Sequence, residues 1–333
     1  MMKYIPRRIS VSPGSLGSCE ASEFLKNSSG SEIINLSDPQ NRENTDIVHL
    51  SEKEGRYLKD CPGTGEEYIC CGYKVLSQAE GCPMECSYCI LQAYFKNSAM
   101  TYYTNQKKLF TELDEALAKG ETLRIGSGEF TDSLALEHLN HFSEKLINYF
   151  SDKKNVLFEV KSKLTNIERL LPLNHGGRTV LAWSLNARSV SSSEEYGSPG
   201  PFERIDAAAL AASAGYYTAF HFDPLILHEG WKRGYSEVID YLYSKVPASS
   251  IRWISAGAFR FMPGLKNIIR QRFPSSKIIY GEFVKCPDGK LRYFRKIREE
   301  LYRHLYSCLK KNDPGICFYF CMEDARMWEK ITG

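Results

Sequence analysis

Residues 81–89 read Gly-Cys-Pro-Met-Glu-Cys-Ser-Tyr-Cys and place three cysteines, Cys82, Cys86 and Cys89, on one short stretch. Thiolates this close in sequence bind an iron–sulfur cluster or a zinc ion. A structural zinc site usually takes four Cys or His ligands, and neither a fourth Cys nor a His lies in this stretch. The spacing therefore predicts three ligands of a 4Fe-4S cluster with one iron left open. Zinc-bound or idle thiols are the alternative.

Short stretches typical of strands alternate with longer stretches typical of helices from about residue 73 onward. The helix-like stretch at 133–150 repeats apolar residues every three or four positions, and the one at 202–216 stops near Gly215, a residue common just past helix ends. Strands that alternate with helices form parallel βα units. The expected strands are residues 73–78, 122–126, 155–161, 179–185, 216–222 and 251–257.

Six such units predict an α/β fold, a partial (β/α)6 barrel over residues 71–273. Residues 1–70 are rich in small and polar side chains, so we expect an N-terminal appendage that adds little core. Residues 274–333 carry a charged helix-like stretch at 296–311 and a strand-like stretch at 316–322, which predicts a C-terminal α+β extension. Functional residues of such barrels follow the carboxyl ends of the strands, and the cysteine stretch follows the first expected strand.

The cysteine motif, with Tyr88 directly before its third cysteine, resembles the signature of the radical S-adenosylmethionine (SAM) enzymes. The resemblance implies a radical SAM barrel in which the open iron of the cluster binds the amino and carboxylate groups of S-adenosyl-L-methionine. Reductive cleavage of that cofactor then yields a 5′-deoxyadenosyl radical. It also implies a reductant such as flavodoxin or ferredoxin as a partner.

Polar residues follow the next three expected strands, where such a cofactor would lie. Gly128 and Glu129 look like the Gly-Gly-Glu element with which the superfamily holds the methionine amino group, and a carboxylate beside a glycine suits an ammonium group. Lys161 can meet a carboxylate, and Ser184 and Asn186 can bond a ribose or a carboxylate. Singly, each is also common as a surface or capping residue. The expected cofactor-binding residues are Tyr88, Gly128, Glu129, Lys161, Ser184 and Asn186.

Four parts of the chain carry a closer resemblance, to the spore photoproduct lyase family, whose members reverse a methylene-bridged thymine dimer in DNA. They are residues 81–95 (GCPMECSYCILQAYF), 131–139, 183–190 together with 202–216, and 222–235 with its His-Glu-Gly-Trp segment. The resemblance extends over about residues 73–250, and more loosely to both termini. It implies a lyase that cleaves a carbon–carbon bond in a pyrimidine lesion, with Tyr88 as a catalytic residue.

Two positions depart from that family's pattern. Its members quench the substrate radical with a cysteine at the end of the second strand, and Glu129 occupies that position here. They also flank the third cluster cysteine with two tyrosines, and Ile90 fills the second place. No cysteine lies between Cys89 and Cys286, so turnover by that family's route would need another thiol as a substitute. Cys70 and Cys71 are candidates by sequence distance, and small buried side chains are the alternative reading of both.

The C-terminal part of the chain is strongly basic. Residues 252–311 hold fifteen Lys and Arg against four acidic residues, a net charge of +11 in a chain whose total is +3. Such asymmetry is typical of polyanion binders, although basic helices also present solvated faces. Interleaved aromatic residues suit phosphate contact combined with base stacking. The expected nucleic-acid contacts, with DNA favoured, are Lys285, Lys290, Arg292, Arg295 and Lys296.

The composition, with 333 residues, 43% hydrophobic and 25% charged, excludes collagen-like and fully disordered chains. No stretch reaches the roughly 18 consecutive apolar residues of a membrane span, and the first residues lack the apolar segment of a signal peptide. With eleven cysteines, these features predict a cytoplasmic protein whose thiols serve metal or redox chemistry. The sequence leaves two alternatives: a radical SAM enzyme that acts on RNA, a peptide or a small metabolite, and a cluster-containing nucleic-acid-binding protein without turnover.

Overall fold

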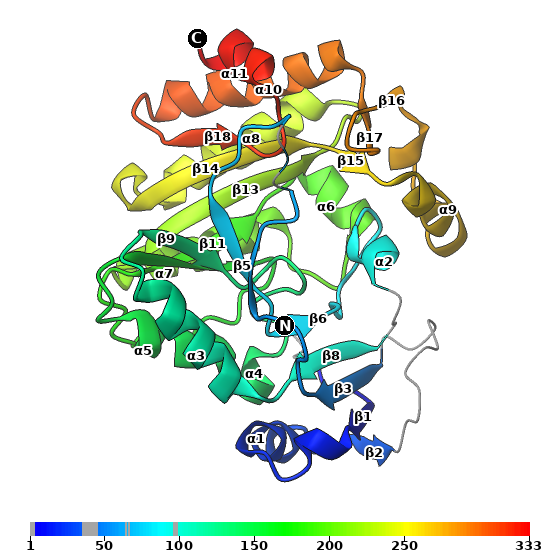
Figure 1. Ribbon diagram of the computed structural model, residues 1–333. Helices are drawn as coiled ribbons and strands as arrows, with labels where there is room; N and C mark the ends of the chain where they lie inside the picture. The colour runs from blue at the N-terminus through cyan, green and yellow to red at the C-terminus, as the bar shows by residue number, and fades with distance from the viewer. Residues whose placement is uncertain (1–3, 35–45, 64, 66, 96–98) are drawn as a thin grey trace.

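The computed structural model describes residues 4–34, 46–63, 65, 67–95 and 99–333. Its largest element is a curled eight-stranded sheet in the order β18-β14-β13-β11-β10-β9-β5-β4 (Figure 1). Neighbouring strands pair in parallel, except that β4 runs antiparallel to β5. The strands are β4 (Leu58–Asp60), β5 (Tyr73–Leu76), β9 (Leu123–Gly126), β10 (Val156–Ser162), β11 (Thr179–Ser184), β13 (Tyr217–Leu225), β14 (Ile251–Ala258) and β18 (Phe318–Phe320).

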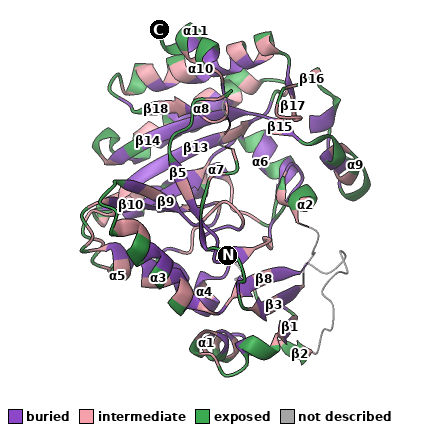
Figure 2. Ribbon diagram, viewed as in Figure 1, coloured by how far each residue is buried: buried purple, intermediate pink, exposed green. Residues whose placement is uncertain are grey.

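The predicted partial barrel is confirmed, because each of the six expected strands overlaps one strand of this sheet. Figure 2 shows that the central strands are almost wholly buried. β11, for example, has five of its six residues buried. Burial on both faces is what a parallel sheet covered by crossover helices requires. The principal helices of the barrel are α3 (Gln106–Leu117), α5 (Phe142–Phe150), α6 (Arg188–Glu194), α7 (Pro201–Ser213) and α8 (Trp231–Lys245).

The single helix expected at 133–150 is wrong, because the structure has two helices there, α4 (Glu137–Asn140) and α5. His141 lies between them with a φ of 49°. The buried carboxylate of Glu137 accepts hydrogen bonds from the N–H groups of Ser143 (2.7 Å) and Glu144 (3.1 Å). Glu137 thereby satisfies the unpaired donors at the start of α5, which explains why a continuous apolar pattern is interrupted. The helix expected at 202–216 is confirmed as α7.

The N-terminal residues form more core than expected. A second sheet has the order β2-β1-β3-β8-β6, with β1 (Arg8–Val11), β2 (Glu32–Ile34), β3 (Ile47–Ser51), β6 (Ala79–Glu80) and β8 (Met100–Tyr103). Helix α1 (Cys19–Asn27) packs on α4, and Ile9, Phe24 and Val48 are fully buried. Strands β6 and β8 come from beyond residue 70, and β4 belongs to the barrel sheet. The structure therefore does not divide the chain at residue 70.

The C-terminal residues are likewise joined to the barrel. β18 is the edge strand of the main sheet and follows α10 (Arg295–Asn312), the predicted charged helix. A small antiparallel sheet has the order β15-β17-β16, and its strands are β15 (Arg260–Phe261), β16 (Phe283–Lys285) and β17 (Leu291–Tyr293). The remaining helices are α2 (Leu91–Tyr94), α9 (Pro263–Arg272) and α11 (Ala325–Thr332). The domain boundary predicted at residue 274 would therefore separate β18 from the sheet to which it belongs.

The two edge strands of the curled sheet, β4 and β18, leave a seam that the segment after β4 spans. The N–H of Ile69 donates to the carbonyl of Glu323, just after β18, at 3.1 Å. The ring of Tyr68 lies 4.9 Å from the guanidinium of Arg292 on β17. Through these contacts, residues 67–72 connect one edge strand of the barrel to the other. None of the helices in the described ranges is long and apolar enough to cross a membrane.

Candidate active site

The three predicted cluster ligands lie on the loop after β6, at the carboxyl end of the first barrel strand. Gly81 has a φ of 89°, and its N–H donates to the carbonyl of Phe130 at 3.0 Å, which fixes the loop to the end of β9. Cys86 ends β7 (Glu85–Cys86), a strand that pairs with β12 (Glu195–Tyr196). Cys89 directly precedes the short segment that leads into α2. The loop is therefore held from both sides by backbone pairing.

The thiols of this loop influence one another electrostatically. Burial, followed by the charges of Asp132 and Cys89, raises the pKa of Cys82 well above its usual value. Burial also raises the pKa of Cys86 to about 12, against the lowering effect of Lys163. Three cysteines on one loop can supply thiolate ligands to iron, so the donor set fits an iron–sulfur cluster by its chemistry. Among the residues that the structure describes, however, no three Cys, His, Asp or Glu side chains are gathered as ligands of one ion.

Tyr88 lies between the cluster cysteines and a buried ion pair that sequence reasoning missed. Its hydroxyl donates a short hydrogen bond to Glu195. Glu195 in turn pairs with Arg204 at 2.5 Å, and both side chains are at most 1% exposed. Burial alone would raise the pKa of Glu195, but Arg204 and Lys163 lower it to about 2. The phenol of Tyr88 is therefore held in one orientation by a permanently charged carboxylate.

Glu129 and Lys161, two predicted cofactor-binding residues from different strand ends, form an ion pair with each other. The Nζ of Lys161 lies 2.9 Å from the Oε2 of Glu129. Gly128 allows this approach, because a Cβ on it would lie only 2.5 Å from the carbonyl oxygen of Lys161. The predicted need for a glycine beside the carboxylate thus has a direct steric cause, namely the close packing of the loop after β9 on β10.

Ser184 and Asn186 lie at the end of β11 and contact protein groups. The Ser184 carbonyl accepts a hydrogen bond from Arg204 at 2.9 Å. The Asn186 amide donates to the carbonyl of Pro224 at 2.9 Å and accepts from the hydroxyl of Tyr235 at 2.7 Å. Asn186 is also fully buried. In the structure this amide connects the end of β11 to β13 and to α8. Its role toward a ribose stays a prediction.

The lumen of the barrel contains a polar layer that the sequence analysis did not identify. The Oε1 of Glu159 lies 2.5 Å from the Nε2 of His221, whose Nδ1 lies 2.7 Å from the Oγ of Ser255. Arg124 adds contacts of 3.0 Å to Glu159 and 2.6 Å to the hydroxyl of Tyr319. A usable signal was present, because Glu159 and Lys161 alternate along the expected strand at 155–161, and His221 and Asp223 alternate at the end of the one at 216–222.

The five predicted nucleic-acid contacts do not form one exposed basic surface. Arg292 is only 2% exposed and makes a bidentate pair with Asp288, at 2.6 and 2.8 Å. Lys290 lies 3.3 Å from the same carboxylate. Arg295 is also paired, with Asp324 and Glu299. Their charges therefore organise the β15-β17-β16 sheet and α10. Exposed side chains remain at Lys285 and Lys296.

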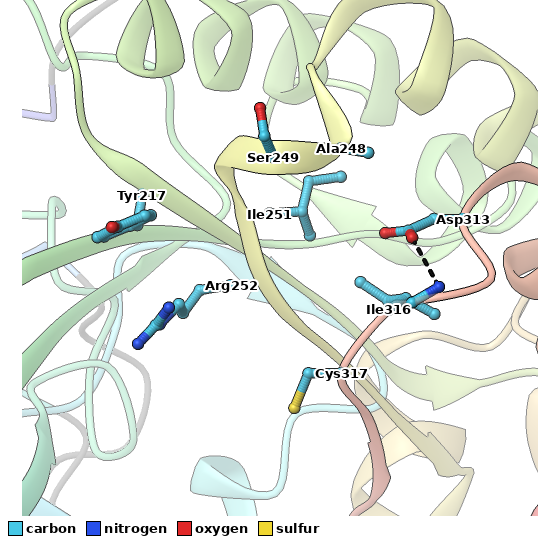
Figure 3. A pocket seen from close by; sticks show the side chains of 9 residues that line it. Tyr217, Ala248, Ser249, Ile251, Arg252, Asp313, Ile316 and Cys317 are labelled. Carbon is cyan, nitrogen blue, oxygen red and sulfur yellow. Dashed lines mark hydrogen bonds between the residues drawn. The ribbon is translucent and has the colours of Figure 1, made fainter.

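A cavity of about 340 Å³ lies at the amino ends of the strands, where β13, β14 and β18 begin (Figure 3). Arg252 and Tyr217 line it with Cys317, and the Arg252 guanidinium lies 5.0 Å from the centre of the Tyr217 ring. Because the cluster loop and the Glu129–Lys161 pair follow the carboxyl ends of the strands, this cavity does not belong to the candidate active site.

Comparisons with known proteins agree with the geometry. The family model of spore photoproduct lyase matches residues 71–310. The spore photoproduct lyases of Bacillus subtilis and of a Geobacillus species are each 27% identical to the chain, over 209 and 248 residues. These matches cover 61% and 71% of this chain, and 61% and 73% of the relatives, so the chain spans less than two thirds of the Bacillus protein.

A solved structure of a spore photoproduct lyase mutant, with bound AdoMet and dinucleoside spore photoproduct, matches with a TM-score of 0.84. The match covers 96% of this chain and 99% of that chain at 21% sequence identity. A second structure of a spore photoproduct lyase, complexed with dinucleoside spore photoproduct, has a TM-score of 0.83. At this identity the likeness establishes the shared fold.

Proposed function

The chain belongs to the spore photoproduct lyase family, and from this we propose that it is a radical SAM lyase that repairs a pyrimidine lesion in DNA. The observation that carries the proposal is the loop of Cys82, Cys86 and Cys89 at the carboxyl end of the sheet, beside Tyr88 in its buried network. A 4Fe-4S cluster on this loop, when bound, would supply the electron that cleaves S-adenosyl-L-methionine to a 5′-deoxyadenosyl radical.

The chain's own residues would position the reactants. Lys163 places positive charge beside Cys86 and Cys89, which favours their thiolates as ligands. Glu129 and Lys161 present one carboxylate and one ammonium at the strand ends, the complements of an amino and a carboxylate group. Glu195 holds the phenol of Tyr88, so that its oxygen stays at one place near the cysteines.

The partners are inferred from the same proposed radical SAM activity. We propose DNA as the substrate, with the exposed Lys285 and Lys296 contacting phosphates, and a flavodoxin-like or ferredoxin-like protein as the reductant. All eleven cysteines are free thiols, which favours a reducing compartment such as the cytoplasm. Glu129 occupies the position at which the family's pattern has a donor cysteine, and this favours a second candidate, a radical SAM enzyme with a different substrate.

The test is anaerobic reconstitution with iron and sulfide, followed by reduction in the presence of S-adenosyl-L-methionine and chromatography for 5′-deoxyadenosine. The proposal expects 5′-deoxyadenosine that increases when dinucleoside spore photoproduct is added. Cys86→Ala should abolish both the cluster absorbance and this product. Cys317→Ala, at the amino ends of the strands, should change neither. Product formation that is indifferent to the lesion would favour the second candidate. An intact cluster without any cleavage would favour a binding protein.

A further inference from the structure

The rim of the barrel beside the cluster loop carries three clustered aromatic side chains. Tyr94 ends α2, Phe95 follows it, and Phe130 lies directly after Glu129 in the loop after β9. The carbonyl of Phe130 accepts the hydrogen bond from Gly81, at the start of the cluster loop. The aromatic trio of Tyr94, Phe95 and Phe130 therefore lies at the carboxyl ends of the strands, where the substrate would enter.

Contacts within the aromatic trio hold the Tyr94 ring in one orientation. This ring stacks on Phe130, with centroids 5.6 Å apart and planes at 20°. Phe95 meets both rings edge to face, at 5.3 Å from Tyr94 and 5.9 Å from Phe130. Offset stacking and edge-to-face contact are the favourable arrangements of aromatic pairs. A ring that is already supported in this way loses little conformational freedom when a planar group binds to it.

The Tyr94 ring keeps an open face. The residue is 54% exposed, although Phe130 covers one side of its ring. The exposed part therefore includes the side turned away from Phe130. Every nucleobase has a flat π-face that stacks on such a ring, whatever its sequence identity. The aromatic trio thus has the form of a stacking surface for a base.

The helix beside the aromatic trio is basic. Helix α9 packs against α2, and its ten residues include Lys266, Arg270 and Arg272 but no acidic residue (Figure 1). Arg270 is exposed and Lys266 is half-buried, and neither forms an ion pair with any residue that the structure describes. Basic side chains that lie beside an exposed aromatic ring are the combination with which proteins hold single strands of nucleic acid.

The acidic residues next to the aromatic trio are neutralised by cations. The Oε1 of Glu85, on the cluster loop, lies 2.8 Å from the Nη2 of Arg272, and Glu129 pairs with Lys161 at 2.9 Å. Lys266 and Arg270 therefore leave a net positive charge for a phosphate backbone. A docking protein could use the same charge, but the position of Phe130 favours nucleic acid. This ring continues the loop whose Glu129 faces Lys161 at the strand ends, beside the opening that the lesion must enter.

We propose that Tyr94, supported by Phe130 and Phe95, is a stacking platform for an unpaired base next to the lesion, and that α9 binds phosphates of the same strand. This assignment rests on the proposed function and adds that the substrate is single-stranded or locally opened DNA. In a duplex both faces of a base are covered by its neighbours, so a base must leave the stack before it can contact Tyr94.

The test measures the fluorescence anisotropy of a labelled single-stranded oligothymidine, and of an oligomer of the same length without bases, with reconstituted full-length protein. Tyr94→Ala should weaken binding of oligothymidine by about 5- to 140-fold, the range for one lost base stack, and leave binding of the abasic oligomer unchanged. Tyr94→Phe and Tyr94→Trp keep a flat ring and should bind as the wild type does. Tyr94→Leu keeps an apolar side chain without a ring and should behave as Tyr94→Ala.

A matched control and the salt dependence separate stacking from charge. Tyr241 also stacks on a phenylalanine, Phe202 at 4.1 Å, but on the outer helices α7 and α8, so Tyr241→Ala should bind both oligomers as the wild type does. Tyr94→Ala removes no phosphate contact and should keep the slope of log affinity against log salt concentration. Lys266→Ala with Arg270→Ala should reduce that slope by about 1.4, because each contact with a single strand contributes about 0.7.

The possible results distinguish a wrong platform from a wrong substrate. Oligothymidine binding by Tyr94→Ala or Tyr94→Leu that equals the wild type would overturn the platform and leave the proposed function intact. Slower 5′-deoxyadenosine formation by Tyr94→Ala with flavodoxin but not with dithionite, at unchanged DNA affinity, would assign the surface to the reductant and also overturn the platform. A wild type that binds neither oligomer would overturn DNA as the substrate and, with it, the platform.

Discussion

The buried pair of Glu195 and Arg204 gives the sharpest stability prediction. In Glu195→Gln the side chain keeps its size but loses its charge, and Arg204 is left as a cation at 0% exposure. Breaking a buried ion pair by removing one partner costs about 3–5 kcal/mol. Arg204 keeps hydrogen bonds to the carbonyls of Pro199 and Ser184, which places the loss near the lower end, about 3 kcal/mol. At about 2.1 cal/mol/K of unfolding entropy per residue, this loss lowers the melting temperature of a 333-residue chain by about 4 °C.

The measurement is thermal unfolding of Glu195→Gln beside a matched control. Glu237→Gln removes the same charge from an exposed pair with Arg233, whose side chains are 48% and 87% exposed, so it should change stability by less than about 0.5 kcal/mol. The double variant Glu195→Gln with Arg204→Gln should recover part of the loss, because no unpaired buried charge remains. A decrease no larger than that of Glu237→Gln, or a double variant less stable than the single one, would refute the reasoning.

Three further predictions concern the loop after β9, the basic surface and α5. In Gly128→Ala the new Cβ would contact the Lys161 carbonyl at 2.5 Å, so the free energy of unfolding should fall by about 1–3 kcal/mol. S-adenosyl-L-methionine binding, measured by calorimetric titration, should also weaken, and unchanged binding would contradict this. Lys285→Ala with Lys296→Ala should reduce the slope of log affinity for DNA against log salt concentration by about 2, and an unchanged slope would remove both lysines from the interface. Burial raises the pKa of Glu137 to about 7, above its ordinary value of 4.5. The folded protein therefore binds this proton more tightly than the unfolded chain does, and the proton stabilises the fold. This stabilisation is complete below pH 4.5 and is lost as the pH rises to 7. Melting curves from pH 5 to 8 should show the wild type losing stability relative to Glu137→Gln, and parallel curves would contradict the assignment.

The sequence was informative wherever a feature depends on neighbours along the chain. The cysteine motif needs eight residues, and the alternation of strands and helices needs about thirty. Those features predicted the barrel, the cluster loop and the placement of Gly128, Glu129 and Lys161 at strand ends. They also predicted correctly that α7 ends before Gly215. The helix expected at 133–150 was wrong because one buried carboxylate, Glu137, interrupts a pattern that is otherwise continuous.

Features that depend on residues far apart in the chain could not be predicted. Glu195 meets Tyr88 across 107 positions, and the seam brings Cys61 to Met322 across the whole barrel. The N-terminal sheet was missed because β6 and β8, which complete it, lie beyond the polar stretch that looked like an appendage. The charges of Arg292 and Arg295 were counted as surface, since the sequence does not show that Asp288 and Asp324 fold back onto them.

The central claim is that this chain uses a cluster-bound S-adenosyl-L-methionine to repair a pyrimidine lesion. The most direct measurement is chromatography of dinucleoside spore photoproduct after anaerobic incubation with the reconstituted protein, S-adenosyl-L-methionine and dithionite. The account predicts conversion of the lesion to the unlinked thymine dinucleoside, dependent on both added cofactor and reductant and absent in Cys86→Ala. Steady formation of 5′-deoxyadenosine with the lesion left intact would contradict it.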